Sequence, residues 1–431
     1  MLELVNTPPL LLADYAPVAG EEAVAEIRRL AQPLRGARVL HVNATKFGGG
    51  VAEILPTLCG LMRDAGLDTE WRIIPGDEAF YNVTKALHNG LQGQPLSLDD
   101  RMRETYRRAN EGFAQAFEGD YDFVVIHDPQ PAALRMLRPD AGGHWIWRCH
   151  IDLTAANAEV WGFLRPAVEA YDAAIFTLPE YVQPDLQLDT LAYIPPSIDP
   201  ISPKNAALDQ SLADSIAYRF GVDPARPLLL QVSRFDPWKD PKGVIEVYRA
   251  VKREVPDVQL ALVASMATDD PEGWQIYKDV LRFAGQDPDL SIVTNLDGVG
   301  AVEVNAFQRA SEVVLQKSLR EGFGLTVSEA LWKGVPVVAG NVGGIPMQLG
   351  DTGGRLVSSI DEATAACLEL LRDPELRRSL GEGGRERVRR HFLSTRNLRD
   401  YLALFTALRT GDRSLVPAGI EASGTTAGAA A

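Results

Sequence analysis

Hydrophobic positions along the chain form short continuous apolar runs that alternate with longer amphipathic stretches. A short apolar run between turn residues predicts a buried strand, and apolar positions three and four residues apart predict a helix. In the first half, the pattern predicts strands at 37–44, 71–76, 121–131, 144–154, 172–181 and 191–200. It predicts helices there at 23–35, 51–62 and 100–118. Residues 76–93 are polar and aromatic, unlike a usual loop between a strand and a helix.

The same alternation restarts near residue 226. Apolar runs predict strands at 226–236, 258–265, 290–296, 311–318 and 335–340. Amphipathic stretches predict helices from Gly243 onward and at 273–283, 302–309, 326–333 and 374–411. Because strands that alternate with helices favour parallel pairing, we expect an α/β protein with two Rossmann-like, doubly wound sheets.

Proline and polar residues at 195–204 separate the two halves and are typical of a linker or hinge. We therefore expect an N-terminal domain at 1–200, a C-terminal domain at 201–394 and a deep cleft between them. The chain ends in a low-complexity segment, so residues 413–431 are expected to be disordered.

Composition narrows the class of protein. The net charge of −15 over 431 residues argues against nucleic acid or an anionic membrane as the main partner. Three widely spaced cysteines, Cys59, Cys149 and Cys367, are too few for a disulfide framework or a zinc site. We expect a cytoplasmic protein, because the sequence shows neither a signal peptide nor an apolar run of about 18 residues.

The predicted strand at 37–44 runs into three glycines, Gly48, Gly49 and Gly50, that precede a helix. Consecutive glycines let the backbone come close to a ligand, and a helix N-terminus offers free N–H groups to a phosphate. No Gly-Lys-Ser/Thr follows, so this is not a Walker loop. The alternative is a merely tight turn between strand and helix.

Histidine and aspartate stand near the ends of two further strands. His127 and Asp128 end one strand signal, and His150 and Asp152 end the next. Functional side chains of open α/β sheets gather where strands end, so these four are candidate site residues. A histidine in such a place can also be a purely structural group, and the sequence leaves both interpretations open.

Two cations follow the first strand of the second half, Arg234 and Lys239. A guanidinium fork and an ammonium at a strand end can together hold a pyrophosphate. The alternative is a solvated ion pair with Asp236 or Asp240.

Residues 317–348 contain Glu321 and Glu329 on either side of the turn Gly322-Phe323-Gly324. Eight helical residues rise by about 12 Å, too far for a glycosidase pair, whose carboxyl groups lie roughly 5–9.5 Å apart. The spacing instead favours one extended ligand, such as a sugar nucleotide. The alternative is a glutamate that interacts with the helix dipole and a solvated glutamate in mid-helix.

The segment EGFGLTVSEALWKGVPVVAGNVGGIP resembles the E-x7-E signature of retaining family 4 glycosyltransferases, which have the two-domain GT-B fold. The resemblance implies that Glu321 meets the donor hexose and Glu329 its ribose. SRFDPWKDPKG is similar to the family region whose arginine and lysine, here Arg234 and Lys239, hold the donor diphosphate. It also implies that helices at about 395–412 return to the N-terminal domain.

Within this family the chain is most similar to the glycosyltransferring trehalose synthases, through HVNATKFGGGVAEIL, WRIIPGDEAFYNVTKALHNGLQG, WRCHIDLT, SRFDPWKDP and SLREGFGLTVSEALWKG. The resemblance implies transfer of glucose from ADP-, UDP- or GDP-glucose to the anomeric hydroxyl of glucose, giving α,α-trehalose, or the reverse from trehalose and nucleoside diphosphate. It implies a catalytic set of Glu321, Arg234, Lys239 and His150. The expected donor contacts are Gly49, Gly50, Arg234, Lys239, Asn295, Gly322, Phe323, Gly324, Leu325 and Glu329, and the expected acceptor contacts are Asn43, Gly48, Asp77, Lys85 and Asp152.

We expect no tightly bound cofactor, because no metal-ligand spacing occurs; Mg²⁺ carried by the nucleotide stays open, as does a homodimer. Trehalose phosphorylase and other family 4 activities remain alternatives. A non-catalytic nucleotide-sugar sensor is an alternative of another class, although it has no need of His150 and Glu321 beside the reacting sugar.

Overall fold

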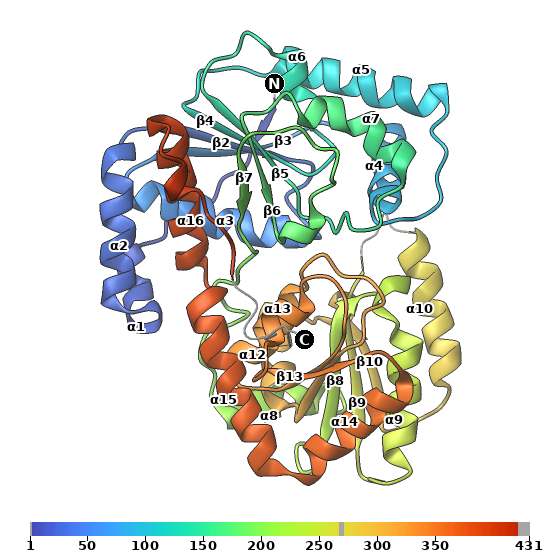
Figure 1. The fold of residues 1–431 in the computed structure, drawn as a ribbon. Helices are drawn as coiled ribbons and strands as arrows, with labels where there is room; N and C mark the ends of the chain where they lie inside the picture. Colours follow the sequence, from blue (N-terminus) through green and yellow to red (C-terminus); the bar gives the residue numbers. More distant parts are fainter. Residues whose placement is uncertain (1, 267–270, 421–431) are drawn as a thin grey trace, which may run out of the picture. The chain divides into compact units, whose positions relative to one another are not determined.

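The computed structural model describes residues 2–266 and 271–420. It divides into two compact units. Unit 1 comprises Met1–Ser197 and Ser394–Ile420, and unit 2 comprises Ile198–Leu393, of which residues 198–266 and 271–393 are described. Figure 1 draws both units as ribbons coloured along the chain.

Unit 1 is built on a seven-stranded sheet in the order β1-β3-β2-β4-β5-β6-β7. The short β1 pairs with β3 antiparallel, and every other pairing is parallel. The strands are β1 Glu3–Leu4, β2 Arg38–Asn43, β3 Asp68–Ile73, β4 Phe123–His127, β5 His144–Arg148, β6 Ala173–Phe176 and β7 Leu191–Tyr193. Parallel strands buried on both faces explain why they appear in the sequence as continuous apolar runs.

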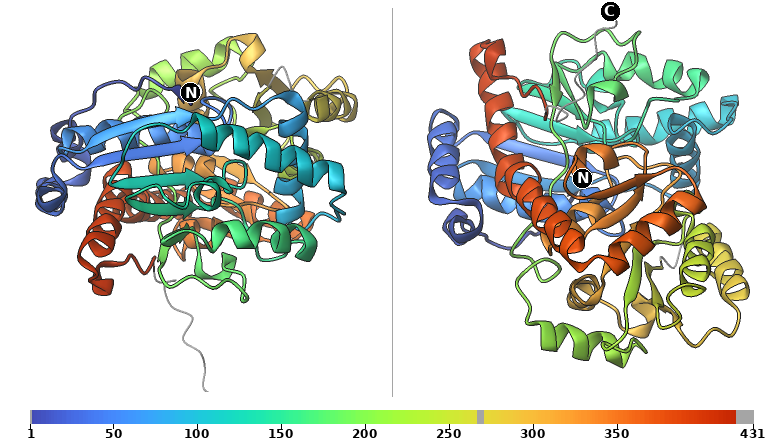
Figure 2. Two further views of the ribbon diagram at one scale, coloured as in Figure 1. Left: turned by 90° about the horizontal axis from the view of Figure 1, so that it is seen from above. Right: turned by 60° about the horizontal axis from the view of Figure 1, so that its bottom comes forward.

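Helices cover both faces of this sheet. They are α1 Ala16–Ala19, α2 Glu21–Ala31, α3 Gly50–Asp64, α4 Glu78–Leu91, α5 Asp100–Ala116, α6 Leu134–Leu137, α7 Ala158–Val168 and α16 Ser394–Thr410. On one face, a large apolar core joins Leu40, Val42 and Val124 to side chains of α4, α5 and α7. On the other face, α16 packs against α2 and α3, as the views in Figures 1 and 2 show.

The register of three neighbouring strands decides which side chains share a face. His41 of β2 pairs with Val125 of β4, and His127 of β4 pairs with Arg148 of β5. Paired residues of a parallel sheet point to the same face, and so do residues two apart on one strand. His41, His127 and Arg148 therefore lie on one face, the face that carries Tyr401 of α16 against His41, with ring centroids 5.9 Å apart.

Unit 2 is built on a six-stranded, wholly parallel sheet in the order β10-β9-β8-β11-β12-β13. Its strands are β8 Leu228–Arg234, β9 Gln259–Ser265, β10 Leu290–Thr294, β11 Val313–Gln316, β12 Val337–Gly340 and β13 Gly354–Val357. Its helices are α8 Gln210–Arg219, α9 Pro241–Lys252, α10 Pro271–Ala284, α11 Ala301–Ala310, α12 Leu325–Trp332, α13 Ile345–Leu349, α14 Ile360–Arg372 and α15 Pro374–His391.

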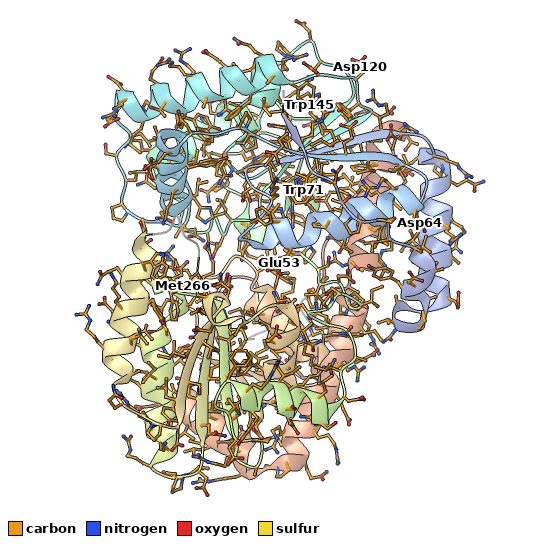
Figure 3. The ribbon with its side chains drawn as sticks, turned by 180° about the vertical axis from the view of Figure 1, so that it is seen from behind. Glu53, Asp64, Trp71, Asp120, Trp145 and Met266 are labelled. Atoms are coloured by element: carbon orange, nitrogen blue, oxygen red, sulfur yellow. The ribbon has the colours of Figure 1, made fainter. Side chains whose placement is uncertain are left out.

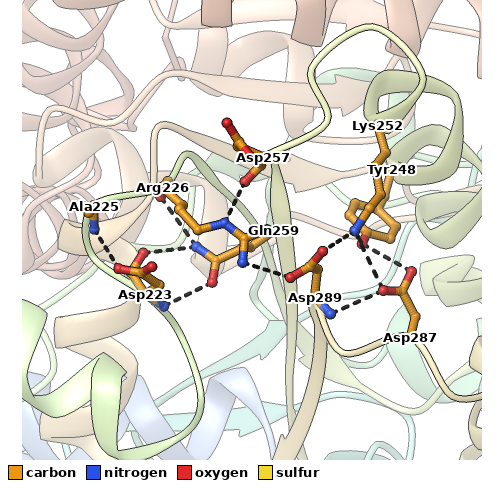
Figure 4. Close-up of polar contacts among 9 residues, drawn as sticks. All are labelled: Asp223, Ala225, Arg226, Tyr248, Lys252, Asp257, Gln259, Asp287 and Asp289. Atoms are coloured by element: carbon orange, nitrogen blue, oxygen red, sulfur yellow. Dashed lines mark hydrogen bonds and ion pairs between the residues drawn. The ribbon is translucent and has the colours of Figure 1, made fainter.

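A polar network fixes the loops at the amino ends of β8, β9 and β10 (Figure 4). Asp289 accepts hydrogen bonds from Arg226, at 2.7 Å, and from Lys252. Gln259 bonds the backbone of Asp223, and Asp287 accepts from Tyr248 at 3.0 Å. These contacts lie at the opposite ends of the strands from Arg234, so they stabilise the unit without taking part in the candidate site.

The structure corrects three expectations. Residues 78–91 form a regular helix, α4, because Asp77 caps its first turn and the positions Phe80, Thr84, Leu87 and Leu91 are buried on one side of it. Residues 413–420 are structured rather than disordered: a short 3-10 turn spans Arg413–Leu415, and Tyr193 donates its backbone N–H to Pro417. The rest of the predicted tail, 421–431, lies outside the described residues. Finally, β5 ends at Arg148, so His150 and Asp152 follow the strand rather than end it.

Candidate active site

The carboxyl ends of the unit 2 strands gather a cluster around Glu321. One carboxylate oxygen, Oε2, accepts from Lys239 Nζ at 2.5 Å, from Ser318 Oγ at 3.2 Å and from Gln316 Nε2 at 3.3 Å. Only 9% of the Glu321 side chain is exposed. A lysine ammonium has three N–H groups, so Lys239 can hold Glu321 and still donate to a second anion.

The glycine turn after Glu321 is shaped by close packing. Gly324 has φ +85°, and a Cβ there would lie 3.1 Å from Glu321 Cγ. Buried Gln348 fixes the other side of the turn, because its amide donates to the carbonyl oxygen of Phe323 and accepts from Ser328 Oγ at 2.6 Å. Gly324 is the N-cap residue of α12 and caps it with no side chain. The first N–H groups of this helix are thus available to an anion.

A second ion pair braces the same edge. Lys317 binds Asp240 Oδ2 at 2.5 Å, and Asp240 also accepts from the backbone of Gly243 at the start of α9. Asp240 has the left-handed φ of +47°. Gln231 donates to the backbone oxygen of Lys239 at 2.7 Å. Together these bonds fix the backbone from which Lys239 reaches Glu321.

Arg234 ends β8 with a largely free side chain, of which 55% is exposed. Among the described residues, its nearest ion-pair partner is Asp236, at 3.8 Å. This distance is too long for a strong hydrogen bond, so the guanidinium can turn toward a ligand at modest free-energy cost.

Glu329 is buried rather than solvated, with 1% of the residue exposed. Its Oε1 lies 2.9 Å from Lys204 Nζ, and its Oε2 lies 3.5 Å from Gln308 Nε2. Lys333 also packs here and donates to Asn205 at 2.8 Å, and burial lowers the pKa of Lys333 to about 7. A ribose contact at Glu329 therefore needs Lys204 to move away from the carboxylate.

Two other expected donor contacts are engaged within unit 2. The Asn295 amide bonds both the N–H and the C=O of Met266, at 2.7 and 3.2 Å, and so fixes the chain after β9. The Phe323 ring is buried against Phe392, with centroids 5.5 Å apart. Phe323 can offer a ligand only its backbone.

In unit 1, His41 of β2, His127 of β4 and His150, which follows β5, form a hydrogen-bonded chain. His41 Nδ1 lies 3.0 Å from His127 Nε2, and His127 Nδ1 lies 3.1 Å from His150 Nε2. His41 and His127 are buried, and His150 is partly exposed. Asp128, at the left-handed φ of +63°, accepts the backbone N–H of His150 at 2.8 Å and so fixes the loop after β5.

Burial sets the protonation of this group. It lowers the pKa of His41 to about 3, and it lowers the pKa values of His127 and His150 well below their ordinary range, with the Arg148 charge adding to the effect on both. Burial raises the pKa of Asp128 to about 6. All three histidines are therefore neutral at pH 7, and each carries one proton on its ring.

A small cavity of about 10 Å³ opens beside the chain of histidines, which is about the space that one water molecule needs. Arg148 lines it with Nε and Nη1 atoms that have no hydrogen-bond partner among the described residues. The remaining lining comes from α3, β4, α16 and neighbouring loops: Val51, Ile54, Leu55, Leu58, His127, His150, Pro196, Asn397 and Tyr401.

Three of the expected acceptor contacts, Asn43, Asp77 and Asp152, make hydrogen bonds within unit 1. Asn43 bonds Trp71 Nε1 at 2.8 Å and the Thr45 backbone at 2.7 Å, and Figure 3 labels Trp71 on its strand. Asp77 caps α4 through the Phe80 N–H, and Asp152 closes a turn onto Thr154. Lys85 is exposed on α4. Gly48 has φ +80°, and Gly49 and Gly50 begin α3, which has no side-chain cap.

Comparison with known proteins decides the family. Residues 41–183 match the family described as trehalose synthase, N-terminal domain, and residues 216–387 match glycosyl transferases group 1. A trehalose synthase of Rubrobacter xylanophilus is 54% identical over 95% of this chain and 99% of its own length. The chain belongs to the trehalose synthase family. A second member, from Pyrococcus horikoshii, is 50% identical over 92% of this chain and 96% of its own.

The fold class is confirmed as well. A UDP-forming α,α-trehalose-phosphate synthase from Burkholderia xenovorans superposes with a TM-score of 0.67, covering 87% of this chain and 99% of the other. At 16% identity this likeness shows the GT-B fold alone.

Several polar residues near the candidate site of this trehalose synthase family member were not predicted from the sequence. His41 and Arg148 stand inside apolar runs, and only the sheet register places them beside His127 and His150. Gln316, Ser318 and Lys317 are adjacent to Glu321 in sequence, so their proximity alone could have marked them.

Within residues 2–266 and 271–420, no group of three or more His, Cys, Asp or Glu side chains is placed to hold a metal ion. No helix in the same residues combines the length and the apolar character needed to cross a membrane.

Proposed function

We propose that the protein makes α,α-trehalose by transferring glucose, with retention of configuration, from a nucleoside-diphosphate glucose to the anomeric hydroxyl of free glucose. The observation that carries this proposal is the match to trehalose synthases across both units. The Glu321 cluster supplies the chemistry that the reaction needs.

Unit 2 is the proposed donor side. Arg234 and Lys239 are proposed to bind the diphosphate, together with the open N-terminus of α12. Glu321 lies against Lys239, so a diphosphate there would bring the donor hexose next to this carboxylate. Three positive groups around a leaving diphosphate stabilise the negative charge that develops on it, which lowers the barrier to transfer.

Unit 1 is the proposed acceptor side, with the glycine loop Gly48–Gly50 and His150. His150 is neutral and partly exposed, so it can form a hydrogen bond to a sugar oxygen without bringing a charge to the site.

The proposed mechanism is a front-face displacement. The bond from the anomeric carbon to the diphosphate oxygen breaks, and the bond from the same carbon to the acceptor oxygen forms on the same face. The acceptor proton passes to the departing diphosphate. Glu321 already binds Lys239, Ser318 and Gln316, which suits a group that orients the sugar better than a nucleophile. Mg²⁺, if it takes part, is proposed to arrive with the nucleotide.

One assay tests the function and its nearest alternatives. The protein is incubated with glucose and, separately, ADP-, UDP- or GDP-glucose, and a non-reducing disaccharide is sought by chromatography with a trehalase digest. We expect trehalose from at least one donor. Formation of trehalose from glucose and glucose 1-phosphate, with release of phosphate, but from none of the three nucleotide sugars would indicate a phosphorylase instead, and donor binding with no product would indicate a sensor.

A further inference from the structure

The hydrogen bonds among His41, His127 and His150 limit which ring nitrogen of His150, the outermost of the three, can carry its proton. Each neutral imidazole carries one N–H and one lone pair, so a hydrogen bond between two of them needs a donor facing an acceptor. Both bonds, 3.0 Å for His41 to His127 and 3.1 Å for His127 to His150, run from the Nδ1 of one ring to the Nε2 of the next. The three rings must therefore share one tautomer, either all Nδ1–H or all Nε2–H.

The surroundings of His41, at the buried end of the three histidines, decide between these two tautomers. His41 Nε2 is buried and has no hydrogen-bond partner among the described residues. A buried N–H without a partner is rarer and more costly than an unpaired lone pair. The packing of the Tyr401 ring against His41 keeps that end closed. The favoured state leaves the lone pair on His41 Nε2 and places the proton on Nδ1.

We propose that His41 and His127 are positioning residues that lock His150 as its Nδ1–H tautomer, so that His150 presents a fixed N–H donor to an oxygen of the bound sugar. The sugar contact rests on the proposed function, whereas the tautomer lock follows from unit 1 alone. His150 cannot exchange tautomer by itself, because inversion requires both of the other rings to shift their protons together.

The surroundings support a fixed donor. The His150 backbone is tied to Asp128, and its ring stacks on His127 with an interplanar angle of 16°. The Arg148 guanidinium lines the same cavity, so a second proton on His127 or His150 is opposed by a buried positive charge. His150 therefore acts as a hydrogen-bond donor of constant charge rather than as a titrating acid.

The test is the ring-nitrogen spectrum of the full-length protein labelled with ¹⁵N-histidine. The chain has six histidines, so a long-range ¹H–¹⁵N correlation spectrum can be assigned with single variants. We expect His41, His127 and His150 each to show a protonated Nδ1 and an unprotonated Nε2 at pH 7, without substrate. A protonated Nε2 on His150, or two protons on its ring, overturns the proposal.

Variants test the coupling between the rings. His41→Phe removes the inner donor, so His150 should show averaged tautomer signals, and kcat should fall about fivefold with KM nearly unchanged. His41→Asn keeps an N–H donor at the Nδ1 position and should restore both the signals and kcat. His144→Gln, on the same strand as Arg148, is the control and should change neither.

The tautomer lock and the trehalose-forming activity can be refuted separately. Unchanged His150 signals in His41→Phe would refute the lock even if the protein makes trehalose. If His41→Phe does not fold, the wild-type spectrum still decides the tautomer. The predicted spectrum in a protein that makes no trehalose would refute the proposed function and leave the lock standing.

Discussion

Arg234 is a residue whose folded-state contacts are few and whose proposed contact is with the leaving group. Because 55% of its side chain is exposed and its nearest ion-pair partner among the described residues is 3.8 Å away, Arg234→Ala should leave the melting temperature almost unchanged. Loss of a charge-assisted contact to the diphosphate should lower kcat about a hundredfold, or about 3 kcal/mol. Steady-state kinetics with the best donor measure this.

Arg219→Ala is the matched control, since Arg219 is 61% exposed on α8 and lies 3.8 Å from Glu303. It should keep wild-type kcat. Activity of Arg234→Ala within about threefold of wild type would remove Arg234 from the diphosphate site.

Lys239→Ala should show a similar loss of kcat, but with some loss of stability, because Glu321 then keeps fewer partners for a buried charge.

Gly324 carries no reactive group, yet it should be sensitive to substitution. Gly324→Ala places a Cβ 3.1 Å from Glu321 Cγ at a φ of +85°. We expect a loss of about 1 kcal/mol of stability from the left-handed backbone and, in addition, a fall in kcat of about tenfold, because the Glu321 carboxylate is displaced. Thermal unfolding and kinetics on one preparation separate the two effects.

Gly285→Ala has a comparable φ of +70° with no atom within 4 Å of the new Cβ. It should lose similar stability and keep full kcat. Equal kcat in the two variants would show that the packing of Gly324 against Glu321 has no part in catalysis.

At the scale of single residues, the sequence shows which side chains are candidates for the site, but not which side chains lie next to them in the fold. The motif around Glu321 could be identified because its residues are local in the chain. The partner of Glu329, Lys204, is 125 positions away, and the partner of His127, His41, is 86 positions away; no local pattern links either pair. The burial of Glu329 beside Lys204 could therefore not be predicted, and the sequence pattern was equally compatible with a solvated glutamate.

At the scale of helices and strands, a charged network stabilises unit 2 by holding the loops before β8, β9 and β10. The hydrogen bonds from Arg226 and Lys252 lower the pKa of Asp289 to about 2. A carboxyl group whose pKa is lower in the folded state adds stability above its unfolded pKa, near 4, and this contribution is lost as pH falls toward 2. Asp289→Asn should therefore cost about 1–2 kcal/mol at pH 7, reduced from the full shift because the pair is partly solvated.

Urea unfolding of wild type and Asp289→Asn at several pH values checks this. The difference between the two proteins should be constant from pH 5 to pH 7 and should shrink below about pH 4. Glu375→Gln, which changes a 77% exposed glutamate paired with Arg378, should differ little from wild type. A difference for Asp289→Asn that stays constant down to pH 3 would mean that another interaction carries the effect.

Helices and strands could be predicted wherever a single spacing of apolar residues dominates the sequence. The buried strands and the helices α3, α5 and α9 follow from apolar spacing alone. Helix α4 did not, because its sequence mixes polar and aromatic residues, and the Asp77 cap becomes clear only once the turn before it is seen. Residues 413–420 were not predicted for a related reason: they are held in part by β7, which lies far away in the sequence, through the bridge between Tyr193 and Ala418.

At the scale of the whole molecule, the proposed chemistry draws on both units. The candidate donor groups, Arg234, Lys239 and Glu321, belong to unit 2, and the candidate acceptor groups, Gly48–Gly50 and His150, belong to unit 1. The sequence predicts a hinge near Pro195–Pro200 in the chain that connects them. Transfer needs reacting atoms within about 3–3.5 Å of each other, so a donor on one unit and an acceptor on the other must be brought together.

We therefore expect ligands that contact both units to favour a more closed arrangement, because such ligands bind that arrangement more tightly. Small-angle scattering should give a smaller radius of gyration with nucleoside diphosphate plus glucose than with either alone. Closure would also keep water from the activated donor, so hydrolysis of the nucleotide sugar should stay far slower than transfer. Glu321→Gln should still close, since it keeps the diphosphate contacts, and this separates closure from catalysis. An unchanged radius at saturating ligand, in a protein that turns over normally, would show that the units do not need to move for transfer.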